Sequence, residues 1–96
     1  MDFKIGNRLV GSNHPPLVIA EIGINHGGDI SIAKEMIDSA SRSGAEVVKF
    51  QTHIVEDEMT KDAKNTIPGN TSVNIYDIMD SCSFSKDQDY EIKEYV

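Results

Sequence analysis

The sequence contains one cysteine, few basic residues and no long apolar run, and each shortage excludes a class of protein. Because Cys82 is the only cysteine, the chain forms no intramolecular disulfide and no multi-cysteine metal site. Lys and Arg number 9 against 16 Asp and Glu, which gives a formal net charge of −7. Nucleic acids and anionic membranes select clustered cations, so neither is expected as the main partner. The longest apolar stretch, residues 17–20, is far shorter than the roughly 20 residues that cross a bilayer.

The N-terminus carries no cationic stretch followed by an apolar core, so no secretory signal is expected. With a single cysteine, this predicts a cytoplasmic protein in a reducing environment. A hydrophobic fraction of 39% and a charged fraction of 26% are typical of a soluble globular protein. A chain of 96 residues forms one domain at most, with a modest core.

A strand–helix–strand pattern occupies the middle of the chain. Residues 17–24 and 45–52 are two apolar segments whose continuity is typical of strands buried on both faces of a parallel sheet. Between them, Asp29 is suited to cap the start of a helix and Gly44 to end it. This order predicts an α/β fold with a βαβ unit, in which the two strands are parallel and adjacent.

A short hairpin is expected before this unit. Residues 3–5 and 8–10 are β-prone runs that flank two turn-forming residues, Gly-Asn. Two consecutive prolines then prevent regular structure up to residue 16. Residues 1–16 are therefore expected to form a hairpin and a loop.

The last third of the chain is expected to hold a long polar loop and two helices. Residues 53–73 form the loop, and a loop of that length in a small domain is usually functional. Residues 75–79 indicate a short helix. Ser85 and Gln88 have the spacing of a capping box and open a second helix. Its apolar face consists of Ile92, Tyr95 and Val96.

The chain stops inside this helix, with no capping glycine and no third strand. Two parallel strands and two helices cannot cover both faces of a sheet. We therefore expect residues 1–96 to be the N-terminal segment of a longer protein, with the first βα units in residues 17–96. Further βα units would complete either a (β/α)₈ TIM barrel or a doubly wound sheet.

Three polar residues of the two strands are candidates for chemistry. Side chains alternate between the faces of a strand, so Glu21 shares a face with Gly23, and Lys49 shares one with Gln51. In a barrel these side chains point inward near the carboxyl ends of the strands, where active sites of that fold lie. A lysine there attracts phosphate or carboxylate, an amide donates or accepts, and a carboxylate orients a hydroxyl. The alternative is a structural Glu21–Lys49 ion pair.

Other polar residues of the sequence carry weaker signals. Residues 23–28, GINHGG, lack the lysine of a phosphate loop and the second glycine of a dinucleotide fingerprint. His26 is either a polar loop residue or a ligand, His14 has a structural role, and His53 could face the site. Three scattered histidines do not form a metal site. Cys82 is expected to be a small core residue.

Several segments resemble the sialic acid synthase family, in particular its bacterial N-acetylneuraminate synthases. They are residues 19–28 (IAEIGINHGG), 44–53 (GAEVVKFQTH), 54–59 (IVEDEM), 67–70 (IPGN) and 3–8 (FKIGNR). The resemblance implies a (β/α)₈ barrel whose N-terminal end is covered by the hairpin. It also implies a C-terminal antifreeze-like domain and a domain-swapped homodimer.

The resemblance implies that phosphoenolpyruvate condenses with open-chain N-acetylmannosamine to give N-acetylneuraminate and phosphate. A divalent ion, Mn²⁺ or Mg²⁺, polarises the sugar aldehyde in that reaction. By resemblance, Glu21 lies near the reacting centre and the metal-bound water. Lys49 and Gln51 hold phosphoenolpyruvate, and Asn70, otherwise a plain turn residue, reaches the amino sugar.

Asn25 and His26 are further candidates for the same site. The family's metal ligands lie on later strands, so no metal ligand is expected within this segment, and the segment alone is expected to be inactive. Two alternatives stay open from the sequence. One is a synthase of legionaminic or pseudaminic acid, and the other is a small non-catalytic α/β binding module that is complete at 96 residues.

Overall fold

Two small β-sheets and five helices make up the structure, a computed structural model that describes residues 1–96. The elements in chain order are β1 (Phe3–Ile5), β2 (Arg8–Val10), β3 (Ile19–Gly23), α1 (Ile30–Arg42), β4 (Val47–Phe50), α2 (Val55–Glu58), α3 (Lys61–Lys64), α4 (Ile75–Ser81) and α5 (Lys86–Tyr95). The molecule is elongated, with extents of 47 × 30 × 24 Å. None of the helices is both long and apolar enough to cross a membrane.

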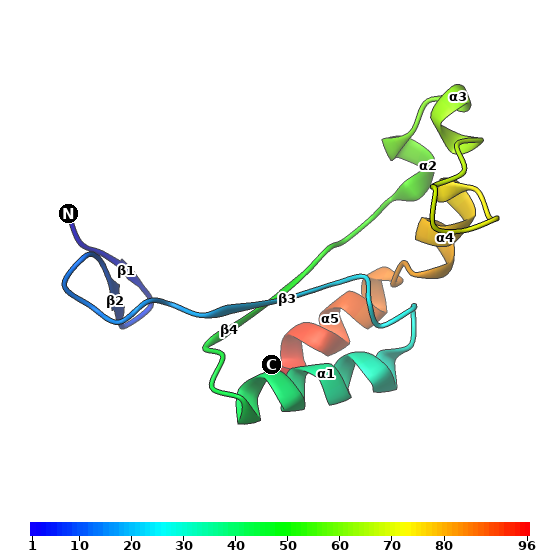
Figure 1. Cartoon of the computed structure of the whole chain (residues 1–96). Coiled ribbons are helices and arrows are strands. Elements are labelled where there is room, and N and C mark those ends of the chain that lie inside the picture. The colour runs from blue at the N-terminus through cyan, green and yellow to red at the C-terminus, as the bar shows by residue number, and fades with distance from the viewer.

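The expected hairpin is confirmed, because β1 and β2 pair antiparallel around the Gly-Asn turn. Arg8 fastens this hairpin to the start of β4. Its guanidinium donates to both carboxylate oxygens of Glu46, from Nε at 2.8 Å and from Nη2 at 3.1 Å. Nη2 also donates to the carbonyl oxygen of Pro15 at 2.8 Å. The paired fork-to-carboxylate geometry fixes the hairpin at the amino end of the second sheet (Figure 1).

The βαβ unit is confirmed as well, since β3 and β4 are adjacent and parallel. Both strands are shorter than the apolar segments that predicted them. The ladder is irregular between Glu21 and Gly23, and each strand has a single partner. Asp29 caps α1 as expected, because its Oδ1 accepts from the backbone N–H of Ser31 at 2.8 Å. Gly44 follows Ser43, the C-cap residue of α1, and has a φ of +94°.

The core lies on one side of the β3–β4 sheet. Figure 1 shows α1 and α5 together on that side. The buried apolar cluster there consists of Ile22, Ala33, Ile37 and Ile92, with Val48 and Phe50 packed against it. Burial on both faces of the strands, expected from their continuous apolar sequence, is not found. Ile19 is 52% exposed, and only 7 of the 96 residues are buried, because no element covers the second face.

The region after β4 differs from the expected long loop, because it contains the single-turn helices α2 and α3. The side chain of Thr60 caps α3, and acidic residues occupy the first turn of α2, which favours helix starts. The expected helices α4 and α5 are confirmed, including the capping box at Ser85. The expected apolar face of α5 is wrong except for Ile92. Tyr95 and Val96 are exposed, and the Tyr95 hydroxyl instead donates to Asp38 of α1.

Candidate functional site

An ion pair stands on the uncovered face of β3 and β4. Glu21 and Lys49 are opposite each other in the strand register, and Nζ of Lys49 lies 2.8 Å from Oε2 of Glu21. The two side chains are 53% and 58% exposed. Their neighbours in sequence, Ile22 and Val48, face the helices, as the alternation predicts. The ion pair that the structural alternative predicts is therefore present, and within residues 1–96 both of its side chains are open to solvent.

Gln51 joins this ion pair at the carboxyl ends of the strands. A Cβ atom on Gly23 would lie 3.6 Å from Oε1 of Glu21 and 3.9 Å from Cδ of Gln51. These are ordinary contact distances, so residue 23 lies between the carboxylate of Glu21 and the amide of Gln51. A cation, a carboxylate and an amide thus share one edge of the sheet. The carboxyl ends of parallel strands are where α/β folds bind their ligands.

A hollow of about 530 Å³ extends from this edge to α4. Gln51 and Asn70 both line it, so the turn before α4 places Asn70 beside the carboxyl end of β4. The remaining lining residues are Ile24, Pro68, Thr71, Ile75, Ile78 and Met79. Two amides and a hydroxyl beside apolar side chains suit a polyhydroxylated ligand that also has a nonpolar face.

A polar cluster joins α4, which lines this hollow, to α2 and α3. Glu56 of α2 accepts hydrogen bonds from Nζ of Lys64 and from the hydroxyl of Tyr76, each at 2.9 Å. The hydrogen bond from Lys64, followed by that from Tyr76, lowers the pKa of Glu56. The same carboxylate raises the pKa of Tyr76. Helices α2, α3 and α4 are thereby joined to one another.

Asn25 and His26 lie in the turn after β3 and do not line the hollow. The Asn25 amide donates to the carbonyl oxygen of Ile22 at 3.0 Å. The His26 ring is 2% exposed and stacks on Phe84, with ring centroids 4.0 Å apart. Its Nδ1 accepts from the N–H of Gly28 at 3.0 Å, and its Nε2 has no partner. Burial lowers the pKa of His26, and the charge of Asp89 opposes that shift.

His53 is the residue whose partners the sequence did not reveal. Its Nδ1 lies 2.8 Å from Oε2 of Glu58, and its Nε2 lies 3.4 Å from Oε1 of Gln51. The other oxygen of Glu58 accepts from the N–H of Ile54 at 2.9 Å. Glu58 reaches His53 because α2 turns the chain back after β4. No periodic pattern in the sequence marks that turn.

The donors present in this segment do not make a metal site. No group of three or more His, Cys, Asp or Glu side chains is placed to hold an ion. Glu21 offers a carboxylate at the candidate site, but Lys49 already engages one of its oxygens. His53 and His14 each pair with one carboxylate, and nothing adds a third donor.

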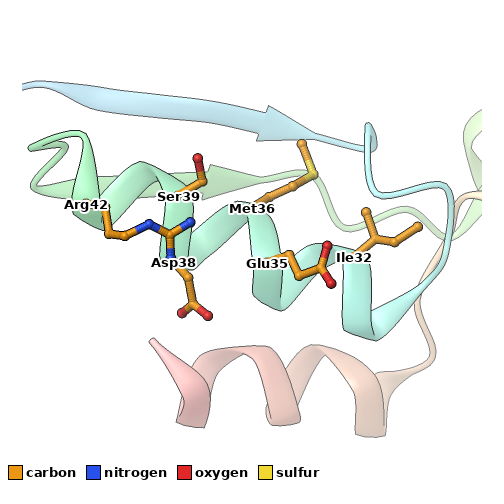
Figure 2. Close-up of a pocket in the computed structure, with 6 residues that line it drawn as sticks. All are labelled: Ile32, Glu35, Met36, Asp38, Ser39 and Arg42. Atoms are coloured by element: carbon orange, nitrogen blue, oxygen red, sulfur yellow. The ribbon is translucent and has the colours of Figure 1, made fainter.

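A second hollow, of about 420 Å³, lies on α1 and contains none of the candidate residues. Figure 2 shows its six lining residues on the flank of α1 between β3 and α5. They are Ile32, Glu35, Met36, Asp38, Ser39 and Arg42. This hollow lies away from the carboxyl ends of the strands and is lined by α1 alone. The candidate site is therefore assigned to the edge of the sheet and not to this hollow.

Comparisons with known proteins agree on a family. A model of the NeuB family matches residues 36–96. The uncharacterized protein MJ1065 of Methanocaldococcus jannaschii is 39% identical over 94 residues, which cover 98% of this chain and 25% of that protein. The N,N′-diacetyllegionaminic acid synthase of Legionella pneumophila is 33% identical over 90 residues, which cover 88% of this chain and 25% of that enzyme.

A solved structure agrees with the sequence comparisons. The N-acetylneuraminic acid (sialic acid) synthetase of Leptospira borgpetersenii superposes with a TM-score of 0.75 at 32% identity. The match covers 99% of this chain and 30% of that one. The chain therefore spans about a quarter of the length of its curated relatives. The resemblance to sialic acid synthases is confirmed, and the chain belongs to the NeuB family.

Proposed function

We propose that this chain is the N-terminal part of an N-acetylneuraminate synthase. The enzyme would condense phosphoenolpyruvate with N-acetylmannosamine to give N-acetylneuraminate and phosphate. The observation that carries the proposal is the meeting of Lys49, Glu21 and Gln51 at the carboxyl ends of two parallel strands, beside the hollow that Asn70 lines. Membership of the NeuB family supports it.

The proposed architecture is a cytoplasmic homodimer of (β/α)₈ barrels. Residues 1–16 would cover the N-terminal end of the barrel, and residues 17–96 would supply its first βα units. The order β3, α1, β4 with parallel strands is that of a βα barrel unit and supports this architecture. The position of α1 and α5 on one face of β3 and β4, which would be the outer face of the barrel, also supports it. In a barrel, the uncovered face that carries Glu21 and Lys49 becomes the interior.

Each polar side chain takes a role that its position allows. The exposed ammonium of Lys49 attracts an anionic group of phosphoenolpyruvate, and Gln51 beside it supplies a neutral hydrogen-bonding group. Glu21 then orients a hydroxyl or moves a proton at the reacting centre. Asn70 binds a hydroxyl or amide of the amino sugar. Asn25 and His26 act by holding the turn that follows β3.

The proposed enzyme also uses Mn²⁺ or Mg²⁺, with ligands outside this segment. The donors present here do not fit such an ion by themselves, so no step of this proposal runs through it. For the same reason we expect residues 1–96 alone to be inactive. Phosphate release from the isolated segment with both substrates would contradict that expectation.

The full-length protein tests the proposal directly. We expect phosphate release that requires both phosphoenolpyruvate and N-acetylmannosamine, with N-acetylneuraminate as the second product by mass spectrometry. No release with any amino sugar would favour the alternative of a non-catalytic binding module. That alternative also predicts that residues 1–96 unfold cooperatively on their own.

A synthase of legionaminic or pseudaminic acid is the second candidate. It is favoured by the 33% identity to the Legionella enzyme over most of this chain. The chemistry at Lys49 and Glu21 would be the same, and the sugar would be a diacetamido-trideoxy hexose. Comparing kcat/KM for that sugar and for N-acetylmannosamine decides between the two products.

A further inference from the structure

His53 connects α2 to the candidate site through two hydrogen-bonding contacts. Nδ1 lies 2.8 Å from Oε2 of Glu58, and Nε2 lies 3.4 Å from the side-chain oxygen of Gln51. The His53 side chain is only 15% exposed, so water competes weakly for these contacts. Glu58 is itself held, because its second oxygen accepts from the backbone N–H of Ile54.

These contacts fix how the imidazole is oriented. An ionised carboxylate only accepts hydrogen bonds, so Nδ1 of His53 must carry a proton that it donates to Glu58. In the neutral ring Nε2 is then an acceptor, so the group of Gln51 that meets it is the amide N–H₂, which the amide presents by turning about its last bond. The other charged groups at this edge, Glu21 and Lys49, bind each other. The side chain of Gln51 therefore has His53 on one side and the hollow on the other.

We infer that His53 and Glu58 are positioning residues that hold the Gln51 amide in the orientation in which it binds substrate. The inference rests on the proposed function, in which Gln51 contacts a substrate. A glutamine side chain has three rotatable bonds, and ordering it on binding costs free energy. The contact with His53 orders the Gln51 side chain before the substrate binds, and the contact with Glu58 holds the imidazole ring in place.

Two substitutions at His53 separate this role from a merely structural one. In His53→Gln, the new amide reaches about as far as Nε2 and keeps a contact toward Gln51. In His53→Asn, the shorter amide occupies about the place of Nδ1, which keeps the contact to Glu58 and loses the one to Gln51. Both are measured in the full-length protein, alone and combined with Gln51→Ala. Asp57→Asn, on the same helix at an exposed position, is the matched control.

We expect His53→Asn to raise the KM of phosphoenolpyruvate, the substrate that Gln51 is proposed to bind, by about fivefold to tenfold. This is the effect of one lost hydrogen bond, and the change in kcat is expected to be smaller. His53→Gln stays within about twofold of the unsubstituted protein, as does Asp57→Asn. In the Gln51→Ala background, neither substitution at His53 adds a further change. Thermal unfolding of each variant reports any loss of fold.

The opposite results overturn the inference. Equal increases of KM in His53→Asn and His53→Gln, or an increase that persists without the Gln51 side chain, would mean that His53 only supports the fold. The proposed function fails in a different way. If the unsubstituted protein releases no phosphate with either class of amino sugar, the proposed function is refuted and the inference falls with it.

Discussion

The strongest test of the fold around the site is Gly28→Ala. Gly28 follows β3 with φ +82°, and a Cβ atom there would overlap the backbone carbonyl oxygen of Ser81 at the end of α4. The atoms that the Cβ would meet belong to the Ser81 backbone, so no flexible side chain can move aside. The turn after β3 and the end of α4 therefore pack against each other only because residue 28 is glycine.

Gly27 provides a matched control one residue earlier. It has φ +65°, and a Cβ atom there would meet nothing within 4 Å. Gly27→Ala therefore introduces only the cost of a left-handed backbone, about 1–2 kcal/mol. Gly28→Ala adds the displacement of α4, and overpacking of this kind costs roughly 1–3 kcal/mol. We expect Gly28→Ala to lower the free energy of unfolding by about 2–5 kcal/mol in total.

Urea unfolding of the full-length protein measures both substitutions. Because α4 also lines the hollow with Ile75, Ile78 and Met79, Gly28→Ala is further expected to raise the KM of the amino sugar. Gly27→Ala leaves that KM unchanged. Equal destabilisation by the two substitutions would refute the close packing of Gly28 against Ser81, and with it the placement of α4 beside the site.

Three further predictions concern the anion contact, the core and pH. Lys49→Ala is expected to raise the KM of phosphoenolpyruvate roughly tenfold or more, as for a lost charge-assisted hydrogen bond; an unchanged KM would refute its role. Ile37→Ala, which empties a buried position, is expected to cost about 2–5 kcal/mol by urea unfolding, whereas Ile32→Ala, at a 44% exposed position, costs much less. Because burial lowers the pKa of His26 below its ordinary 6.5, the unfolded chain binds more protons than the folded one between the two pKa values. The stability that neutral His26 contributes is therefore complete above pH 6.5 and is lost as the pH falls through the folded pKa, and a flat stability profile from pH 8 to pH 5 would contradict this.

The parts of the site that lie on the strands could be predicted from the sequence. Alternation along a strand is a strict local rule, so it placed Glu21 and Lys49 on one face and Val48 and Phe50 on the other. The parallel orientation of the two strands followed from the strand–helix–strand order, and the structure adds the register, which pairs Glu21 with Lys49 directly. The helix starts were equally local, because Asp29 and Ser85 cap the next turn of their own chain.

Contacts between distant segments could not be predicted in this way. His26 is buried because Phe84, which is distant in the sequence, stacks on its ring. No residue near position 26 indicates that contact. Gln51 and Asn70 share a hollow only because α2 and α3 fold the polar segment between them. His53 and Glu58 meet across the same fold. These features depend on how short helices pack, and their sequences are compatible with an open loop.

The contact that the structural alternative predicted, a Glu21–Lys49 ion pair, is also the resting state that the functional proposal needs. A sealed pair would have to stay together, because removing one partner leaves a charge buried without compensation. In residues 1–96 both side chains are more than half exposed, and separating an exposed pair costs little. Once the face is enclosed, the pair separates only if each charge gains a new partner. In the proposed enzyme, an anion that binds Lys49 would replace Glu21 as its partner and leave that carboxylate free when a substrate is present. Enclosure of this face by the further βα units that we propose would exclude water and strengthen the attraction between the ammonium and that anion. The same two residues would then serve in turn as a stable pair and as an anion site with a free carboxylate beside it.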